Sequence, residues 1–587
     1  MADNSLPEGD ALRLTRDLGD RGPSLAERLS ERLDRLSFAS PWHRMRLQGR
    51  FPLKLLAVPT DPIPGDPETG ARLKAGKLEY AGYGARMDNG RLDDPAAPVF
   101  WHDQVHGWGW LRDAAAAGPS TRTESTRIEG LARRWLARFH NYDEIAWAPA
   151  RTGRRIMMAI TYAPLVMPGH DHIHRSAVLN GIARWARHLD RAAPRVPPGT
   201  DRAEAAAGLL AAALLLPSGD ERRVRAEALL ADTLGRIVHQ DGSVVTRSPL
   251  ELAQGGDLLL FLSAFYKARA QRPPAWMDET RRHMRNALTG LAMGDGLPGP
   301  WHGGQPTLAM MERLGATPVS ADARPGRDSG YQRLAAGQTI LVMDAGPPPP
   351  ARLSDTAHAS TLAIMMSDGK QPLIVSCGSG TAAEPLPSEL QLGLRSTAGH
   401  STLVLADSNS SRLADGGPRK LGGVQEVLVE TRASGDGQWL EAQHDGYRKR
   451  FGVQHLRRLY LSPDGQDLRG EDVLLPASHG LTRLGRTDAL DVVVRFHLGP
   501  GCSATGTQDG SGALISLPVS KNGRTAEKSA WAFRASFNSA PGRISIEPSI
   551  LIDANGQAQD IQQIVLATKA GPGVQASIGW SFRRQGK

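Results

Sequence analysis

The stretch S-D-T-A-H-A-S-T-L at residues 354–362 is followed by I-V-S-C-G at 374–378 and by R-S-T-A-G-H-S-T-L at 395–403. We interpret these three stretches as consecutive β-strands. This interpretation places His358, His400 and Cys377, one of only two cysteines in the chain, on neighbouring strands. Histidine and cysteine side chains gathered in this way indicate a functional site on a β-domain.

Working outward, short β-forming runs separated by Gly, Asp and Pro continue from about residue 324 to the C-terminus. They lie at residues 339–343, 373–375, 401–405, 424–430, 490–498, 513–517 and 563–567. This pattern is typical of an all-antiparallel β-domain, which we expect to be a large sandwich.

Residues from about 102 to 291 show a different periodicity, with apolar side chains at i, i+3, i+4 and i+7. The helices expected from this spacing cover residues 127–139, 153–164, 174–189, 203–216, 222–239, 250–270 and 277–291. No fixed-period repeat is visible, which disfavours a solenoid. We expect antiparallel helix pairs that form an incomplete (α/α) toroid, although the periodicity also fits other helical arrays.

The N-terminal region begins with a capping box at residues 24–27, and leucines at 25, 29, 33 and 36 predict an amphipathic helix over 24–36. Residues 41–70 are rich in proline and predict an extended connector. The chain is therefore expected to be a multidomain α + β protein. Its predicted parts are residues 1–70 (helix and connector), 71–322 (toroid) and 323–587 (β-sandwich).

Composition fits a globular protein, with 40% hydrophobic and 22% charged residues in a chain of 587. The net charge of +9 and the pI of about 9.7 come from basic residues spread along the chain rather than massed in a tail. This distribution argues against nucleic-acid binding and fits a broad groove for acidic ligands. The excess of Arg over Lys suits carboxylate and sulfate recognition, but it also fits the codon usage of a GC-rich genome.

Several classes of site and location are disfavoured by the sequence. Two cysteines do not make a disulfide scaffold, and we find no phosphate-binding loop, no dinucleotide-binding glycine motif and no G-x-S-x-G element. The first 22 residues lack the apolar run of a signal peptide, and the apolar run at 205–216 is too short to span a membrane. We therefore expect a cytoplasmic protein without transmembrane segments; a homodimer is left open.

The three stretches quoted above resemble motifs of the heparinase II/III-like polysaccharide lyases, in the same order. The segments at 329–334, 443–447 and 455–458 are also similar to this family, and the helices-then-strands order matches its (α/α) toroid followed by a β-sandwich. The resemblance implies an acidic, uronate-containing polysaccharide or oligosaccharide as substrate. It also implies a place in the cell envelope, in tension with the absence of a signal peptide.

In such lyases, β-elimination needs a group that neutralises the C5 carboxylate, a base for the C5 proton and an acid for O4. The resemblance implies an Asn, a Tyr and His residues for these tasks. At the matching positions this chain has Thr200-Asp201 for the Asn, Glu251 for the Tyr, Thr356 for the first His and Ser360 for an Asp. The usual acid and base set is therefore largely replaced.

We expect Glu251 to act as a base with its pKa raised by an apolar setting, and Arg247 to hold the substrate carboxylate. His358 and His400 are expected either to assist the chemistry or to hold a metal. The family resemblance implies a zinc ion here, with His358, Cys377 and His400 as its ligands. Because neighbours on a strand alternate, only one of Ser376 and Cys377 can face that site. The expected substrate contacts are Arg395, Tyr331, His302 and Trp108.

Three hypotheses follow. The first is a lyase that cleaves an acidic glycan by β-elimination. The second is a non-catalytic protein that binds anionic glycans or serves in assembly, having kept the fold and lost the base. The third, a glycoside hydrolase, would need a pair of carboxylates across the cleft, and the sequence offers only Glu251.

Overall fold

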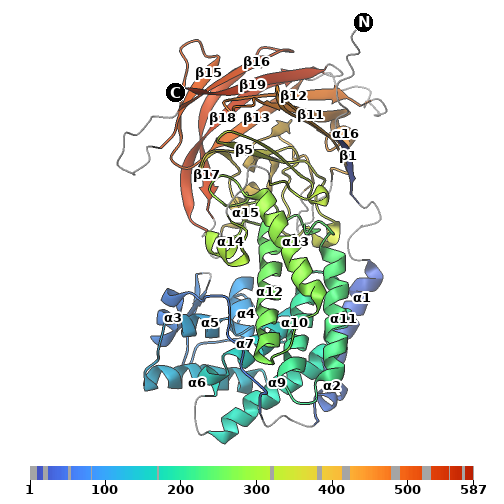
Figure 1. The fold of residues 1–587 in the computed structure, drawn as a ribbon, viewed down its shortest axis with the longest axis vertical. Coiled ribbons are helices and arrows are strands. Elements are labelled where there is room, and N and C mark those ends of the chain that lie inside the picture. Colours follow the sequence, from blue (N-terminus) through green and yellow to red (C-terminus); the bar gives the residue numbers. More distant parts are fainter. Residues whose placement is uncertain are drawn as a thin grey trace.

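The computed structural model describes residues 10–16, 24–49, 54–80, 82–167, 171–317, 323–379, 386–412, 423–477, 489–518, 530–553, 556–571 and 575–585. The chain forms a helical domain and a β-sandwich domain stacked along the long axis of the molecule (Figure 1). Both termini lie at the sandwich end (Figure 1). Within the described ranges, no helix is long and apolar enough to cross a membrane.

Most of the helical domain lies between residues 99 and 314, where helices pack in antiparallel pairs. Its longer helices are α6 (Arg122–Arg138), α7 (Pro149–Thr161), α9 (His172–Ala192), α10 (Thr200–Leu215), α11 (Asp220–Ile237), α12 (Pro249–Ala268) and α13 (Ala275–Leu291). Shorter helices are α4 (Val99–His106), α5 (Trp110–Ala116), α8 (Ala163–Val166), η1 (Ala193–Arg195) and α14 (Leu308–Leu314). All seven helices expected from periodicity in this region are present.

Local chemistry explains where these helices begin. Thr121 and Glu124 form a reciprocal capping box at α6, and the Ser248 hydroxyl caps α12, whose first residue is Pro249. Helix α10 consists largely of alanine and leucine and packs against α7, α9, α11 and α12. Because it is apolar on nearly every side, it forms the centre of the helical core.

The sandwich consists of two antiparallel sheets. One has the strand order β1-β9-β10-β11-β12-β19-β16-β15-β14, and the other β17-β18-β13-β7-β6-β5-β4, with β8 paired to β13. The bounds are β1 Asp10–Thr15, β4 Tyr331–Ala336, β5 Thr339–Asp344, β6 Ile364–Asp368, β7 Gln371–Val375, β8 Leu403–Leu405, β9 Glu426–Ser434, β10 Gly437–His444, β11 Val453–Leu461, β12 Asp467–Pro476, β13 Leu490–Leu498, β14 Ser503–Gly506, β15 Gly512–Ser516, β16 Ala530–Phe537, β17 Arg543–Ile552, β18 Ala558–Ala570 and β19 Ala576–Gln585. Short helical pieces of this domain are η2 (Arg327–Ser329), η3 (Ala351–Leu353), α15 (Ser388–Arg395), η4 (Thr397–Gly399) and α16 (Arg448–Phe451). Each sheet turns one apolar face inward, as the alternating burial of β10 illustrates.

The N-terminal region differs from its expected form in two ways. Strand β1 pairs with β9, from Asp10 opposite Thr431 to Thr15 opposite Glu426, so the first described residues belong to the sandwich. The proline-rich segment is not wholly extended, because it contains α2 (Pro41–Arg46) and α3 (Pro67–Lys74). Both helices begin at a proline, a position where its missing N–H costs nothing.

The expected amphipathic helix is present as α1 (Leu25–Ala39). A hairpin that the sequence reading missed, β2 (Lys77–Tyr80) with β3 (Tyr83–Arg86), follows α3.

The two quoted histidine stretches are not strands. Residues 354–362 form a loop between η3 and β6, and His400 follows η4 just before β8. Short polar side chains explain the difference, because Ser360 and Thr397 bond to Asp344 and to the Ala359 carbonyl instead of leaving the backbone to pair as a ladder.

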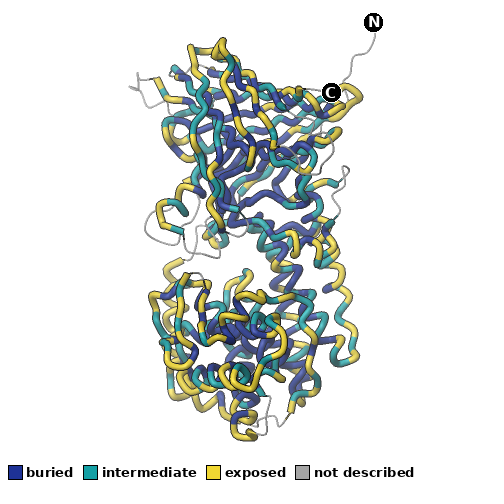
Figure 2. Tube along the Cα trace, turned by 90° about the vertical axis from the view of Figure 1, so that its left-hand side faces the viewer, coloured by how far each residue is buried: buried dark blue, intermediate teal, exposed yellow. Residues whose placement is uncertain are grey.

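Buried residues form a separate core in each domain (Figure 2). A smaller apolar cluster joins the domains, with Leu291, Met293 and Trp301 from the helical side against Tyr331, Val342 and Met365 from the sandwich. The polar residues expected at the functional site lie beside this junction.

Candidate functional site

Three buried histidines meet where the helical domain contacts the sandwich. His302 lies in the loop that follows α13, while His358 and His400 come from the two sandwich loops. The ring centroids of His358 and His400 are 5.1 Å apart, and those of His302 and His358 are 6.2 Å apart. All three side chains are at most 1% exposed.

Backbone and side-chain hydrogen bonds fix the three rings. The His358 N–H donates to Nδ1 of His302 over 3.2 Å, and the Gly303 N–H donates to Nε2 of His358 over 3.3 Å. The Nδ1 atom of His400 lies 3.0 Å from the Ser376 hydroxyl. His302 holds this geometry at a φ of +43°, a backbone strain typical of functional or tightly constrained positions.

Asp344, at the end of β5, is the charged centre of the cluster. Its carboxylate lies 2.5 Å from Nη2 of Arg247 and 3.3 Å from Nε2 of His302, and it accepts a 2.6 Å hydrogen bond from Ser360. Burial alone would raise the pKa of Asp344, but Arg247 and the bonds from His302 and Ser360 hold it well below the usual range. The sequence reading missed Asp344, although it directly follows the run predicted as strand 339–343.

The Arg247 guanidinium is bonded to protein groups at the interface between the two domains. Besides Asp344, it donates to the carbonyls of Ser329, Gly330 and Pro347 over 2.9–3.0 Å. These bonds use four of the five donors that an arginine carries. Arg247 is 7% exposed and links the helical domain to the sandwich. That it binds a substrate carboxylate stays a prediction.

Tyr331 and Arg395 also form hydrogen bonds to backbone carbonyls of the protein. The Tyr331 hydroxyl donates to the Arg247 carbonyl over 2.6 Å, its ring lies 4.7 Å from the Arg247 guanidinium carbon, and burial raises its pKa well above the usual value. Arg395 donates to the Ala357 and Ser354 carbonyls and so fixes the loop that carries His358. Neither residue presents an exposed polar group, since they are 2% and 5% exposed.

The histidines are electrically neutral in this setting. Burial lowers the pKa of His400 to about 3 and that of His358 well below the usual value, with neighbouring histidines adding to the effect. Within the described residues, Nδ1 of His358 and Nε2 of His400 have no hydrogen-bond partner. Such orphaned nitrogens in a buried setting need an explanation, and metal coordination is the first one to test.

The donor set does not fit the expected zinc site. Cys377 points away from the histidines toward the other side of the strand, where its sulfur lies 3.4 Å from Nδ1 of His497 and 3.6 Å from the Ser549 hydroxyl. Ser376 faces His400 in its place, and a neutral hydroxyl is a poor zinc ligand. No group of three or more His, Cys, Asp or Glu in the described ranges could hold a metal ion.

Glu251 lies in the first turn of α12. Its described hydrogen-bond partners are Thr200, Thr246 and Ser248, and it borders a cavity of about 50 Å³. Burial raises its pKa, as expected for a base of this kind. Pockets that hold small molecules measure roughly 300–1,000 Å³, so the cavity is too small for a sugar ring.

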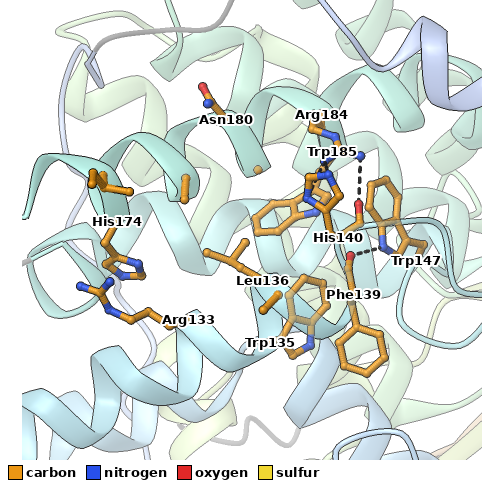
Figure 3. A pocket seen from close by; sticks show the side chains of 14 residues that line it. Arg133, Trp135, Leu136, Phe139, His140, Trp147, His174, Asn180, Arg184 and Trp185 are labelled. Carbon is orange, nitrogen blue, oxygen red and sulfur yellow. Dashed lines mark hydrogen bonds between the residues drawn. The ribbon is translucent and has the colours of Figure 1, made fainter.

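Trp108, expected to contact substrate, lies in the helical core. Its indole is fully buried against Trp110, Trp135 and Trp185, with ring centroids 5.5–6.0 Å apart. It is a packing residue. Trp135 and Trp185 also line a hollow of about 450 Å³ between α6 and α9, where Arg184 contacts His140 (Figure 3).

Comparison with known proteins gives consistent matches. Residues 318–581 match the family model "Heparinase II/III-like, C-terminal". A curated relative, FtsZ-localized protein C of Caulobacter vibrioides, is 30% identical over 569 residues, covering 94% of each chain.

Solved structures agree on the architecture. A heparinase III structure superposes with a TM-score of 0.68 at 11% identity over 97% of this chain and 93% of its own. Heparan sulfate lyase HepC of Pedobacter heparinus superposes with a TM-score of 0.57 at 13% identity, covering 89% of this chain and 83% of its own. The predicted fold class, an incomplete (α/α) toroid followed by an antiparallel β-sandwich, is confirmed.

Proposed function

The chain belongs to the heparinase II/III-like family, and from this premise we propose that it is a non-catalytic assembly protein that has kept the lyase fold and lost the elimination chemistry. The family supplies the toroid and the sandwich. The chemistry at the junction between them is what has changed.

One observation carries this proposal: the polar groups expected to act on a substrate are satisfied by the protein itself. Elimination needs a reachable base, a reachable acid and a free group that neutralises a carboxylate. Here Arg247 is paired with Asp344, Tyr331 is bonded to the Arg247 carbonyl, and the three histidines are buried and neutral. These contacts join the two domains. Among the residues just named, they leave no reachable base, no reachable acid and no group free to neutralise a carboxylate.

The relative supports an assembly role. It shares 30% of its residues with this chain over nearly the whole length of both, and its name states that it localises with FtsZ. We propose that this chain likewise associates with FtsZ assemblies. The elongated two-domain shape offers a large surface for such contacts (Figure 1).

A lyase is the second candidate, and one observation favours it. Glu251 is a partly buried carboxylate with a raised pKa, the property that a general base near neutral pH requires. Its cavity of about 50 Å³ would have to open widely for a glycan to reach the carboxylate. We therefore place this reading second.

The test has two arms. The purified full chain is incubated with heparan sulfate, chondroitin sulfate, hyaluronan and alginate, and the absorbance of new C4–C5 double bonds is followed. In parallel, the chain is pelleted with polymers of FtsZ from the same organism.

Absence of unsaturated product together with pelleting on FtsZ polymers is the expected result. An unsaturated product that disappears in Glu251→Gln and persists in Glu221→Gln, a control at a side chain 94% exposed, would overturn the proposal in favour of a lyase. No pelleting with FtsZ would overturn the assembly role.

A further inference from the structure

The hollow of about 450 Å³ between α6 and α9 takes no part in either proposed function. Both helices lie at the end of the helical domain away from the sandwich (Figure 1). The volume equals that of about 15 water molecules at ~30 Å³ each, within the range of roughly 300–1,000 Å³ that small-molecule sites occupy. The size of this α6–α9 hollow therefore suits a small organic ligand.

Apolar side chains form much of the lining. Trp135 and Trp185 contribute the edges of buried rings, at 1% and 2% exposure. Leu136 lies between the two ends of the hollow (Figure 3), and Ile173, in the first turn of α9, is 84% exposed. A ligand with an apolar body would remove these side chains from water, which is favourable in proportion to the apolar area covered.

Arg184 carries a charge at one end of the hollow that no carboxylate neutralises within the described part of the chain. Its Nη2 donates to the His140 carbonyl over 2.9 Å, and its Nη1 contacts the His140 ring. Partial burial and the charges of Arg184 and Arg44 lower the pKa of His140, so this ring is neutral. The positive charge of Arg184 therefore has no counter-charge beside it.

A second uncompensated arginine lies behind the lining rings. Arg155 of α7 is fully buried, and its guanidinium carbon is 4.3 Å from the ring centroid of Trp135 and 4.5 Å from that of Trp185. It donates to two backbone carbonyls and to the Thr152 hydroxyl, and no described carboxylate pairs with it. Charged side chains are almost never fully buried unless paired. An anion in the hollow would lie across these rings from Arg155 and supply the missing counter-charge.

The opposite end of the hollow is not basic. Arg133 lies there (Figure 3), and it is paired with both Glu129 and Asp171. This difference between the two ends sets the direction of a bound anion. Its charged group belongs beside Arg184, and its apolar body belongs over Leu136, toward the end that holds Arg133.

We infer that the α6–α9 hollow binds a small organic anion, with an apolar body about the size of an indole and one carboxylate or phosphate. Arg184 binds the anionic group, because the planar guanidinium matches the oxygens of a carboxylate or phosphate. Trp185, Leu136 and Ile173 contact the apolar body. The site lies apart from the domain junction, and the inference rests on neither proposed function.

The experiment titrates the full chain with small-molecule probes by calorimetry. Indole-3-acetate and phenyl phosphate combine an apolar ring with a carboxylate or a phosphate. Indole-3-acetamide lacks the charge, and inorganic phosphate lacks the ring. We expect both complete anions to bind, and each incomplete probe to bind at least about tenfold more weakly, because a hydrogen bond to a charged group contributes a factor of that size. The tighter of the two complete anions identifies the preferred charged group.

Variants of the lining locate the binding. Arg184→Gln should weaken the binding of both anions by about tenfold or more, and Arg184→Lys should retain part of the affinity. Arg281→Gln, at a side chain 37% exposed on α13, is the matched control and should bind like the unmodified chain. Ala177→Trp tests the site without changing charge, because Ala177 is exposed and lines the hollow. A large ring there should abolish binding, while circular dichroism and thermal melting verify that each variant folds.

Three results would overturn the inference. The first is no binding of either complete anion at millimolar concentration. The second is equal affinity for indole-3-acetate and indole-3-acetamide, or for phenyl phosphate and inorganic phosphate, because the hollow would then not recognise charge and apolar body together. The third is unchanged affinity in Arg184→Gln or in Ala177→Trp, which would place the binding elsewhere on the protein.

Discussion

Arg247 of the helical domain and Asp344 of the sandwich form an ion pair with 2.5 Å between Nη2 and Oδ1, at 7% and 0% side-chain exposure. The pair lies at the place where the family resemblance implied catalysis. A charge pair so deeply buried needs every remaining donor and acceptor satisfied, and Ser329, Gly330 and Ser360 provide those bonds. The domain junction is thus built from the kind of residues that an active site would use.

Arg247→Met should destabilise the protein strongly. The substitution leaves the Asp344 carboxylate buried without its cation, which costs about 3–5 kcal/mol. Urea unfolding of the variant measures the loss. Arg352→Met is the matched control, because its pair with Glu27 is about half exposed and should contribute little to the unfolding free energy.

The double variant Arg247→Met with Asp344→Leu separates charge from packing. It removes both charges, so it should recover part of the stability lost in the single variant. A double variant less stable than Arg247→Met would show that the ion pair is not the source of the effect.

Stability should fall as the solution is acidified from about pH 6.5. The pKa of His400 is lowered to about 3 in the folded protein, so between these values the unfolded chain binds a proton that the folded chain does not. Each such histidine contributes a slope of up to about 1.4 kcal/mol per pH unit. His400→Gln should reduce the slope by that amount in urea unfolding at pH 7, 6 and 5. An unchanged slope would contradict the assignment.

Asp344 affects the stability of the protein at lower pH than the histidines do. The pKa of Asp344 is lower in the folded protein than in the unfolded chain. Its contribution to the unfolding free energy is therefore complete above about pH 4, the ordinary carboxyl range, and is lost as the pH falls below that range. The two effects are therefore separable by pH, since the histidine effect begins near pH 6.5 and the Asp344 effect near pH 4.

The helices and strands were predictable because periodicity is a local property of the chain. Helix α10 was predicted from apolar spacing at i, i+3, i+4 and i+7, and strand β13 from a short β-forming run, both at nearly the observed bounds. The motif order brought His358 and His400 to one site. Their burial was not predictable, because it depends on how the loop holding His302 packs against the sandwich.

Three further features were set by tertiary contacts that no single segment encodes. Asp344 was missed because an acidic residue at the end of a strand is common. Its importance depends on the ion pair with Arg247, which comes from the other domain. Alternation predicted that only one of Ser376 and Cys377 faces the histidines, but that this residue is Ser376 depends on where His400 packs. The outward direction of the leucines on α1 depends on ion pairs with Arg352 and Arg195, distant in the sequence.

Both cysteines should be unreactive in the folded protein. Burial raises the pKa of Cys377 to about 11 and that of Cys502 to about 11, and only the thiolate attacks an alkylating reagent efficiently. Iodoacetamide should label neither residue before unfolding and both in urea, as peptide mass spectrometry can measure. A chelator should leave the melting temperature unchanged, because Cys377 does not join the histidines. A lower melting temperature in chelator, restored by zinc, would revive the metal site.

Glu251→Gln provides the last test, because the two proposed functions differ in what the substitution should do to turnover. Burial raises the pKa of this carboxyl, so its charged form is disfavoured in the folded protein at pH 8. Removing the charge while keeping the shape should therefore raise the unfolding free energy, with no change in binding to FtsZ polymers. A base kept for catalysis would give the same gain in stability and a loss of turnover on a uronate polymer. The stability measurement therefore shows that the substitution has acted as intended, and the turnover assay beside it decides between a scaffold and an enzyme.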